Sequence, residues 1–296
     1  MSPDVSIVVV THDSAADLSR SLPSAVAQKG VSVEIVVVDN ASTDPSRDVA
    51  LLYAPNVRVL ALPENVGFAA ATNAGIAATT GRYVLSLNPD CRLAPDYAET
   101  LVRRLDARTE AGSASGRIFR AAGDDLAPTT RLDSTGIVFT ASGRHFDRGS
   151  GEEAEGLYLE EEEISGATAA AGFYRREALD SAKISTGYFD SDFFLYREDA
   201  DLALRLSQLG WTCLYVPGAV AWHRRRNLPE RRGRMSAAAN LRTFVPTFAR
   251  DVVVVGACLT VEPTSLPAFS WLWKNRRRLW AKRREIRDRV TARRRR

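Results

Sequence analysis

A short acidic segment in the second half of the chain carries residue types suited to acid–base chemistry. Glu198, Asp199 and Asp201 place three carboxyl groups within four residues. Like charges this close repel one another, which raises the proton affinity of at least one of them and suits a general base. One of these acids could instead cap a helix that the leucine spacing predicts at 202–209, because early acids favour the helix dipole. Capping explains one carboxylate well and three poorly.

A second set of polar side chains follows apolar segments that look like strands. Its members are Thr11, Asp13, Asp39, Asn65 and Asp90. In an open parallel sheet, ligands bind at the carboxyl ends of the strands, and these residues would gather there. Asp and Asn also form turns and helix caps, so each residue alone has a purely structural explanation. Jointly they indicate a ligand pocket.

No glycine-rich phosphate loop accompanies these residues. The first apolar segment leads into Thr11-His12-Asp13-Ser14 and not into G-x-G-x-x-G, and the chain has no G-x-x-x-x-G-K-[ST] motif. A divalent metal ion is then the expected means of neutralising a bound diphosphate, and an oxygen ligand such as Asp90 suits Mg²⁺ or Mn²⁺. His223, which follows an apolar stretch, is open to a structural role or to metal binding, because imidazole also suits Mn²⁺.

The segments that would position these groups alternate between strand and helix. Val5–Val10 and Val33–Val38 are strongly apolar, β-branched runs with one polar residue each, Ser6 and Glu34, and are typical of parallel strands that helices cover on both faces. A helix is predicted between them. Strands at Val57–Ala61 and Tyr83–Leu87 flank a second predicted helix at Phe68–Ala78. This alternation predicts an α/β fold with a doubly wound, mostly parallel sheet.

The following part of the chain has weaker patterns. Residues 110–165 are rich in Gly, Ala, Ser and acids, which predicts short strands and long loops. The apolar run Phe193–Tyr196 is expected to be buried beneath the acidic segment. Gly210–Pro217 predicts a further strand shortly before His223.

Four motifs in the first ninety residues resemble those of the family-2 inverting glycosyltransferases with the GT-A fold. They are Val5–Thr11, Asp39–Asp44, Asn65–Ala69 with Asn73 and Gly75 after it, and Leu87–Asp90. The Asn-Pro-Asp form of the last motif, together with the later blocks, is similar to a bacterial rhamnosyltransferase-like branch. The resemblance therefore implies a Rossmann-like sheet of the GT-A type.

The resemblance also implies roles for individual residues. The residues implied to hold a nucleotide-diphosphate sugar are Thr11, Asp13, Asp39, Asn65, Gly67, Asn73 and Asn88. Asp90 would hold the metal on the diphosphate, and His223 would complete this metal or diphosphate site. Asp199, the central acid of a Glu-Asp-x-Asp element, would accept the proton of the acceptor hydroxyl, with Glu198 and Asp201 beside it. Many family members have Asp-x-Asp where this chain has Asn88-Pro89-Asp90, so the motif offers one carboxylate.

The C-terminal end of the sequence is strongly basic. Residues 274–296 hold thirteen Lys or Arg and two acids, and since the whole chain carries +4, the remainder has an excess of about seven negative charges. A helix is predicted here with one apolar stripe formed by Leu272, Trp273, Leu279, Trp280, Ile286 and Val290. A basic helix with tryptophans is typical of a peripheral anchor on an anionic membrane. Packing on the acidic body or dimer formation is the alternative, and no motif for nucleic-acid binding accompanies the basic residues.

Cysteine usage and apolar run lengths bear on location. Cys91, Cys213 and Cys258 are far apart, there is no C-x-x-C pair, and the N-terminus shows no signal peptide. These features predict a reducing, cytoplasmic setting. The apolar run Val252–Val261 is ten residues long, short of the roughly 20 that span a bilayer. Any membrane contact is therefore expected to be peripheral, on the inner face.

Together these features predict one GT-A-like domain and a tail. Residues 1–90 would bind the nucleotide sugar, 91–225 would form the acceptor and catalytic part, and 226–296 would be a helical, basic extension. The resemblance implies inverting transfer of a sugar, and its rhamnosyltransferase-like branch favours L-rhamnose from dTDP-L-rhamnose. The basic tail favours a lipid-linked saccharide as acceptor, as in cell-surface polysaccharide synthesis. A nucleotidyltransferase should carry a glycine-rich loop and early basic residues, which are missing. A non-catalytic membrane- or nucleic-acid-binding protein would need only the tail.

Overall fold

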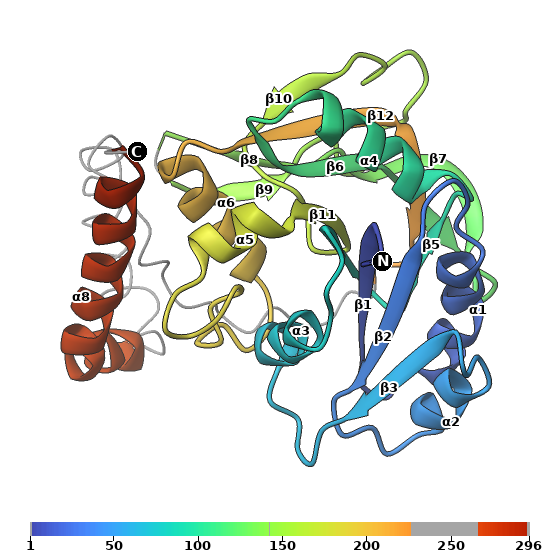
Figure 1. The fold of residues 1–296 in the computed structure, drawn as a ribbon, viewed down its shortest axis with the longest axis horizontal. Coiled ribbons are helices and arrows are strands. Elements are labelled where there is room, and N and C mark those ends of the chain that lie inside the picture. Colours follow the sequence, from blue (N-terminus) through green and yellow to red (C-terminus); the bar gives the residue numbers. More distant parts are fainter. Residues whose placement is uncertain (1, 142, 226–265, 295–296) are drawn as a thin grey trace.

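The computed structural model describes residues 2–141, 143–225 and 266–294 (Figure 1). The predicted features Val252–Val261 and Cys258, and the first forty residues of the predicted extension, lie outside the described residues. Within the described chain, helices cover both faces of a ten-stranded sheet. The predicted α/β class is therefore confirmed.

The first ninety residues form the parallel half of this sheet. Its strands stand in the order β4-β1-β2-β3, and every adjacent pair is parallel. The strands predicted from the apolar runs are confirmed. Such runs are stable as parallel strands because helices cover both faces of the sheet. The elements are β1 (Val5–Thr11), α1 (Ala15–Val26), β2 (Val33–Asp39), α2 (Ser46–Leu51), β3 (Val57–Ala61), α3 (Phe68–Ala77) and β4 (Tyr83–Leu87).

The second half extends the sheet beyond β4. Strand β11 runs antiparallel between β4 and β6, and β12 runs parallel to β6 on the other side. The elements are β5 (Cys91–Leu93), α4 (Tyr97–Ala107), β6 (Ala111–Ala122), β7 (Ala127–Ser134), β8 (Ile137–Phe139), β9 (His145–Asp147), β10 (Glu162–Ile164), β11 (Ala171–Arg175), α5 (Arg176–Ala182), α6 (Glu198–Gln208), β12 (Thr212–His223) and α8 (Leu266–Arg294).

The prediction of short strands and long loops for residues 110–165 is wrong at its start. Strand β6 has twelve residues and pairs with β7, β11 and β12. Its small residues suit this position because large aromatic rings pack against it. A Cβ atom on Gly112 would lie 2.8 Å from the Cβ of Trp211, and one on Gly116 would lie 2.6 Å from the ring of Tyr97.

Two apolar cores lie on opposite faces of the sheet, because successive side chains of a strand point to opposite sides. Ile7 and Val9 belong to the core that α1 and α4 cover. Val8 and Val10 belong to the core that α3, α5 and α6 cover. The carboxyl ends of the central strands remain between these layers, where the polar residues follow.

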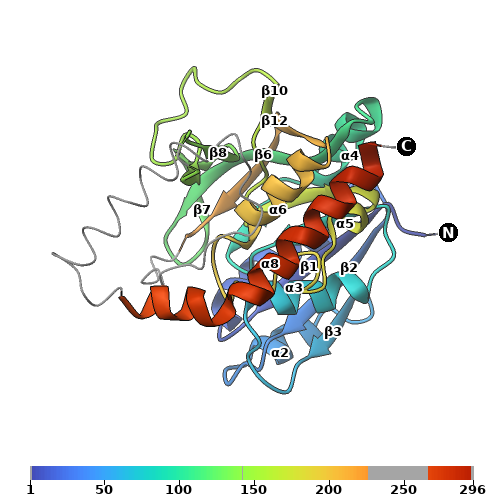
Figure 2. The same cartoon turned by 90° about the vertical axis from the view of Figure 1, so that its left-hand side faces the viewer.

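Helix α8 lies beside α5 and α6, at the edge of the molecule opposite α1 and α2 (Figures 1 and 2). Its Ile286 is 5% exposed, whereas Trp273 and Trp280 are 70% and 68% exposed. The predicted single stripe containing all three residues is therefore wrong. Positions 280 and 286 are about one and two-thirds turns apart, which separates them around the helix. No helix in the described part of the chain is both long and apolar enough to cross a bilayer.

Candidate active site

Asp90 and His223 meet at the carboxyl end of the parallel strands. A short turn after β4 leads into β5, which pairs with the end of β12 so that Cys91 lies opposite His223. Asp90 Oδ1 consequently lies 3.1 Å from His223 Nε2. Asn88 Nδ2 lies 3.3 Å from the same nitrogen. The fold thus brings together three of the predicted site residues.

A second carboxylate holds the other side of the imidazole. Asp133 Oδ2, near the end of β7, lies 2.8 Å from His223 Nδ1. Burial by itself lowers the pKa of His223, but the charges and hydrogen bonds of Asp90 and Asp133 outweigh burial and raise that pKa to about 10. The imidazole is therefore protonated at neutral pH as the structure stands.

Arg225 connects a further acid to this cluster. Its guanidinium lies 3.3 Å from Asp133 Oδ1 and 2.8 Å from Asp147 Oδ2. Burial raises the pKa of Asp147, and although Arg225 opposes this, the charges of Asp199 and Asp133 reinforce it. Asp147 therefore shares its electrostatic environment with both the predicted base and the His223 cluster.

The donor atoms of Asp90 and His223 fit a divalent metal ion, which would take the place of the proton on His223 Nε2. A carboxylate oxygen and an imidazole nitrogen suit Mn²⁺, and Asp133 would accept the Nδ1–H bond as an outer-shell carboxylate does. Among the described residues, no group of three or more His, Cys, Asp or Glu surrounds a common metal position. The protein would thus supply two ligands, and phosphate oxygens and water would supply the others, as is usual for Mg²⁺ in nucleotide sites.

The acidic segment forms the first turn of α6, and its carboxylates have different surroundings. Asp199 Oδ2 accepts a hydrogen bond from Ala169 N at 3.1 Å. The carbonyl of the next residue, Ala170, accepts one from Asn88 N at 2.9 Å. Two consecutive residues therefore connect Asp199 to the turn that carries Asp90. Asp201 is buried and forms an ion pair with Arg205, at 2.8 Å, within the same helix.

Glu198 is buried and neutral at neutral pH. Its side-chain Oε2 has no hydrogen-bond partner among the described residues. Burial and then the charge of Asp199 raise the pKa of Glu198 to about 8. The neutral form avoids repulsion with Asp199.

We expect Glu198→Gln to stabilise the protein above pH 8. The folded state holds the Glu198 proton up to about pH 8, while the unfolded chain releases it near 4.5. The free energy of unfolding of the wild type therefore falls by a few kcal/mol (order of magnitude) as the pH rises from about 4.5 to about 8. The glutamine variant has no such proton and lacks this loss. Urea unfolding at pH 5 and pH 8.5 measures the difference, with the exposed Glu160→Gln as the control. Equal pH slopes for Glu198→Gln and wild type would contradict the assignment.

The predicted nucleotide end of the site lies at the ends of β1 and β2. Thr11 and Asp39 are direct cross-strand partners, and both are buried. Asp13 is exposed, and its Oδ1 accepts hydrogen bonds from the backbone of Thr43 and Asp44 at 2.6 and 3.2 Å. Asp13 thereby orders the turn after β2, beside Asp39.

A pair of asparagines shapes the loop after β3. Asn65 Oδ1 accepts hydrogen bonds from Asn40 Nδ2 at 2.9 Å and from Gly67 N at 3.0 Å. Gly67 has a φ of +84°, and a Cβ there would lie 2.5 Å from the carbonyl oxygen of Phe194. Only glycine fits this close approach, which explains the residue type.

Asn73 contacts the loop after α5. Its Oδ1 accepts a hydrogen bond from Phe189 N at 2.9 Å, and its Nδ2 donates one to Phe189 O at 2.7 Å. In the same loop Phe193 is buried, but Phe194 is 44% exposed. The expectation that the whole run 193–196 is buried is therefore wrong: Phe194 places its carbonyl and one edge of its ring against Gly67, and the rest of its side chain is exposed.

Sequence patterns do not single out Asp133 or Asp147, whereas Arg225 belongs to the Arg224–Arg226 run after His223, which predicts contact with a diphosphate or with lipid phosphates. Asp133 precedes Ser134-Thr135-Gly136, and Asp147 lies in a short, polar segment, so each has the appearance of an ordinary turn residue. Strand pairing of β7 with β6 and of β9 with β8 brings them to His223 and Arg225. The only feature of the sequence that could have pointed to Asp133 and Asp147 is that each is an acid within a predicted loop region.

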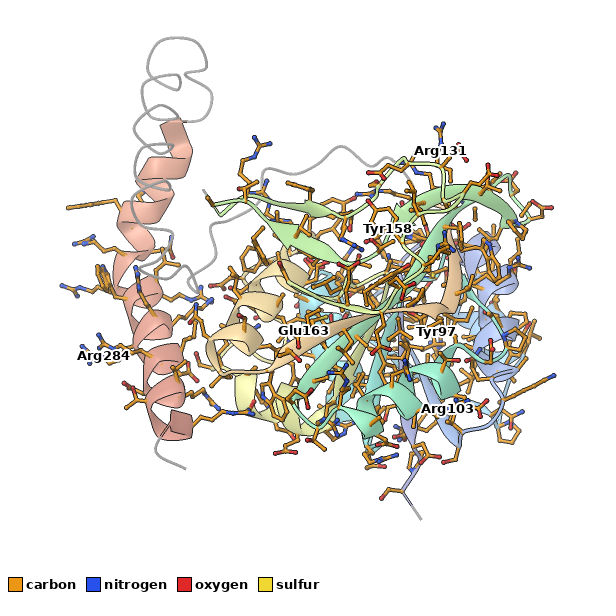
Figure 3. The ribbon with its side chains drawn as sticks, turned by 90° about the horizontal axis from the view of Figure 1, so that it is seen from above. Tyr97, Arg103, Arg131, Tyr158, Glu163 and Arg284 are labelled. Carbon is orange, nitrogen blue, oxygen red and sulfur yellow. The ribbon has the colours of Figure 1, made fainter. Side chains whose placement is uncertain are left out.

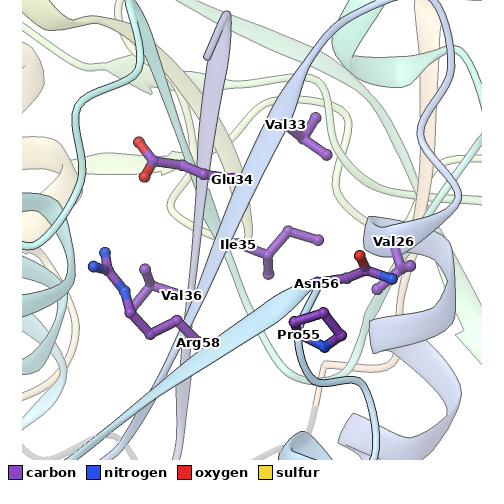
Figure 4. A pocket seen from close by; sticks show the side chains of 8 residues that line it. All are labelled: Val26, Val33, Glu34, Ile35, Val36, Pro55, Asn56 and Arg58. Atoms are coloured by element: carbon purple, nitrogen blue, oxygen red, sulfur yellow. The ribbon is translucent and has the colours of Figure 1, made fainter. Parts of the chain in front are cut away.

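A separate pocket lies at the other end of the strands. Val33–Val36 of β2, with Val26, Pro55, Asn56 and Arg58, line this pocket at the amino ends of β2 and β3 (Figure 4). Its one carboxylate, Glu34, accepts hydrogen bonds from Ser6 and from the backbone of Thr80 and Gly81. The pocket shares no residue with the candidate site.

Comparison with known proteins gives consistent matches. The model of the family described as Glycosyl transferase family 2 matches residues 6–183. A protein described as Succinoglycan biosynthesis protein ExoO from Rhizobium meliloti is 43% identical over 36% of this chain and 30% of its own length. A protein described as N-acetylglucosaminyl-diphospho-decaprenol L-rhamnosyltransferase from Mycobacterium tuberculosis is 28% identical over 75% of this chain and 76% of its own length.

A solved structure supports the fold. The structure of GalNAc-T7 with UDP, GalNAc and Mn²⁺ superposes with a TM-score of 0.56 at 16% identity. The match covers 75% of this chain and 44% of that chain. The match to this enzyme confirms the predicted GT-A architecture.

Proposed function

The chain belongs to glycosyl transferase family 2, and on this premise we propose that it transfers a sugar from a nucleotide-diphosphate donor to a hydroxyl group with inversion. The observation that carries the proposal is the connection from Asp199, through residues 169 and 170, to the Asn88–Asp90 turn. It sets a proton acceptor beside a polar cluster at the carboxyl ends of parallel strands, where ligands bind in such sheets.

In this reaction Asp199 accepts the proton of the acceptor hydroxyl while the hydroxyl oxygen bonds to the anomeric carbon. The bond from that carbon to the diphosphate breaks on the opposite face, and its electron pair leaves with the nucleoside diphosphate. When bound, Mg²⁺ or Mn²⁺ on Asp90 and His223 would supply charge stabilisation to the diphosphate. Asp133 orients His223 through its Nδ1 hydrogen bond. Glu198, which is neutral at neutral pH, adds no second negative charge beside Asp199.

The donor would lie along the strand ends. Thr11, Asp13 and Asp39 would bind the base and ribose, since they lie at the ends of β1 and β2. Asn65 and Gly67 would shape the wall of this pocket, and Asn88 would face the diphosphate beside His223. Asn73 would act through the loop that it holds, whereas Asp201, which is bonded to Arg205, would stabilise α6 without contacting a substrate.

Two relatives support a narrower assignment. The similarity to an L-rhamnosyltransferase over three quarters of both chains favours dTDP-L-rhamnose as donor and a lipid-linked saccharide as acceptor. The similarity to a succinoglycan biosynthesis protein agrees with a place in cell-surface polysaccharide synthesis.

We expect turnover with dTDP-L-rhamnose to exceed turnover with UDP-hexoses by at least about 5-fold, because one mismatched polar contact in a pocket costs about 1 kcal/mol or more. Product formation on a polyprenyl-diphosphate saccharide, with Mn²⁺ present, measures this. Turnover with UDP-glucose or UDP-N-acetylglucosamine and none with dTDP-L-rhamnose would refute the donor while leaving glycosyl transfer intact.

A lipid-linked acceptor requires contact with a membrane, and α8 has a suitable face. Trp273, Trp280, Arg277, Arg284 and Arg287 are all exposed. Helical geometry groups them opposite Lys282 and Ile286, which face the body. Figure 3 shows Arg284 on the side of α8 that is turned away from the body. We therefore place this face on an anionic, cytoplasmic membrane surface.

Replacing Arg277, Arg284 and Arg287 with Gln is expected to weaken binding to phosphatidylglycerol vesicles about 100-fold, since each basic residue contributes about 1 kcal/mol near such a surface. Vesicle sedimentation measures the partition. The matched control replaces three other exposed arginines, Arg47, Arg103 and Arg131. Equal losses in both triple variants would show a general charge effect and remove α8 as the contact surface.

A further inference from the structure

Helix α8 is bound to the rest of the protein through a buried lysine. Lys282 is 3% exposed, and its Nζ lies 2.7 Å from both carboxylate oxygens of Asp190. The same ammonium also bonds to Asp192, which Arg278 contacts from the next turn of α8. A buried lysine is tolerated only when acids compensate its charge, so this arrangement specifies where α8 docks.

Both acids belong to the loop that leads into the catalytic helix. We call residues 187–197 the α6 entry loop, because Glu198 and Asp199 follow it directly. Burial by itself raises the pKa of Asp190, but the hydrogen bonds from Lys282 and from the backbone of Asp192, together with the lysine charge, outweigh burial and lower that pKa. Asp190 Oδ1 also accepts a hydrogen bond from Asp192 N at 3.0 Å. The ammonium thus closes a compact turn in the middle of the loop.

The opposite side of the α6 entry loop contacts the predicted donor motif. Phe189 exchanges two hydrogen bonds with the side chain of Asn73. Phe194 O accepts a hydrogen bond from Phe68 N at 2.7 Å, directly after Gly67. The loop therefore lies between α8 and the motif that begins at Asn65.

The end of the loop adopts an unusual backbone conformation. Tyr196 and Arg197 have φ values of +69° and +72°, immediately before Glu198. Two consecutive non-glycine residues in this region persist only where their surroundings determine the conformation. The contacts that hold the loop from outside are therefore needed to aim the first turn of α6.

We propose that Lys282 is a positioning residue for the reaction: from the C-terminal helix, it fixes the α6 entry loop and so sets the position of Asp199 against the donor. This inference rests on the proposed function. It makes α8 a part of the active-site framework in addition to its outward basic face.

The test compares Lys282→Met with Lys274→Met, which removes an exposed lysine charge from the same helix. We expect Lys282→Met to lower kcat about 10- to 100-fold, because a misplacement of about 1 Å can cost 100-fold, with the donor KM changed less than threefold. Lys282→Arg should recover part of kcat. Lys274→Met should retain wild-type kcat on a soluble acceptor.

A triple variant separates positioning from stability. Combining Lys282→Met with Asp190→Asn and Asp192→Asn removes the uncompensated buried charges, so the thermal midpoint should return toward wild type while kcat stays low. If the triple variant regains wild-type kcat, or if Lys282→Met retains kcat within twofold, the positioning role is wrong.

Hydrogen exchange distinguishes failure of this inference from failure of the proposed function. Lys282→Met should accelerate exchange of the backbone amides at 187–199 at least about 10-fold, whether or not a sugar is transferred. A wild type without glycosyl transfer overturns the function and, with it, the catalytic consequence. An active wild type with unchanged exchange in Lys282→Met overturns the inference alone.

Discussion

Asp199→Asn is expected to lower kcat by about 10²- to 10⁴-fold, the range that a positioned general base contributes. The amide cannot accept the acceptor proton, but it has nearly the same shape and can still accept the hydrogen bond from Ala169 N. Donor binding should stay within about twofold, because the proposed donor contacts lie at the ends of β1 and β2. Initial rates with saturating donor, together with calorimetric titration of the nucleotide, measure the two effects separately.

Asp201→Asn is the matched control for this variant. Asp201 lies two residues further along α6 but is bonded to Arg205 inside the protein. Its replacement should destabilise the fold by about 3–5 kcal/mol, the usual cost of breaking a buried ion pair, while kcat per folded molecule changes little. If Asp199→Asn keeps more than a tenth of wild-type kcat, or if Asp201→Asn loses as much, Asp199 is not the base.

Asp90→Asn is expected to weaken Mn²⁺ binding by about 100-fold or more and to lower turnover at limiting Mn²⁺ by the same factor. Asp90 is the one carboxylate that the Asn88-Pro89-Asp90 turn offers, and it lies 3.1 Å from His223 Nε2. Loss of an outer-shell partner already costs 10- to 100-fold in metal affinity, so loss of a ligand charge should cost at least that. Mn²⁺ binding followed by electron paramagnetic resonance, without donor or acceptor, gives the affinity directly.

Asp133→Asn separates ligand from support in this cluster. It retains an acceptor near His223 Nδ1 but removes the charge, so Mn²⁺ affinity should fall less than in Asp90→Asn, by about 10-fold. Saturating Mn²⁺ should restore most of the turnover of Asp133→Asn and little of that of Asp90→Asn. Unchanged Mn²⁺ affinity in Asp90→Asn would mean that the diphosphate is neutralised by other groups.

Prediction from the sequence was accurate where local chemistry decides the structure. Val5–Val10 and Val33–Val38 could only be covered strands, because so many adjacent β-branched side chains need burial on both faces. The polar residues at their ends consequently reach one edge of the sheet. The pairing of Asp90 with His223 followed from the resemblance and is present in the structure, although their metal and catalytic roles remain predictions.

Prediction was poorer where a residue's position depends on distant partners. Residues 110–122 were predicted as part of a region of short strands and long loops, because small residues carry little strand signal. In the structure the rings of Tyr97 in α4 and Trp211, directly before β12, fill the space beside the glycines of this strand. Trp273 and Ile286 were predicted on one apolar stripe, but they are about 3.6 turns apart and so lie on nearly opposite sides of the helix. Docking of Lys282 decides that the side with Ile286 is the buried one. Helical spacing alone does not say which face a partner covers.

The sequence by itself determined the α/β class, the strand ends that carry Asp39 and Asp90, and the acidic turn with Asp199, because backbone propensity and side-chain period act over a few residues. Only the tertiary structure decided that Asp133 and Arg225 join His223, that Asp201 is committed to Arg205, and that Lys282 holds the α6 entry loop. Those contacts join residues that are far apart in the chain or on different elements. Their free energy comes from burial and charge pairing, which exist only after the elements have packed.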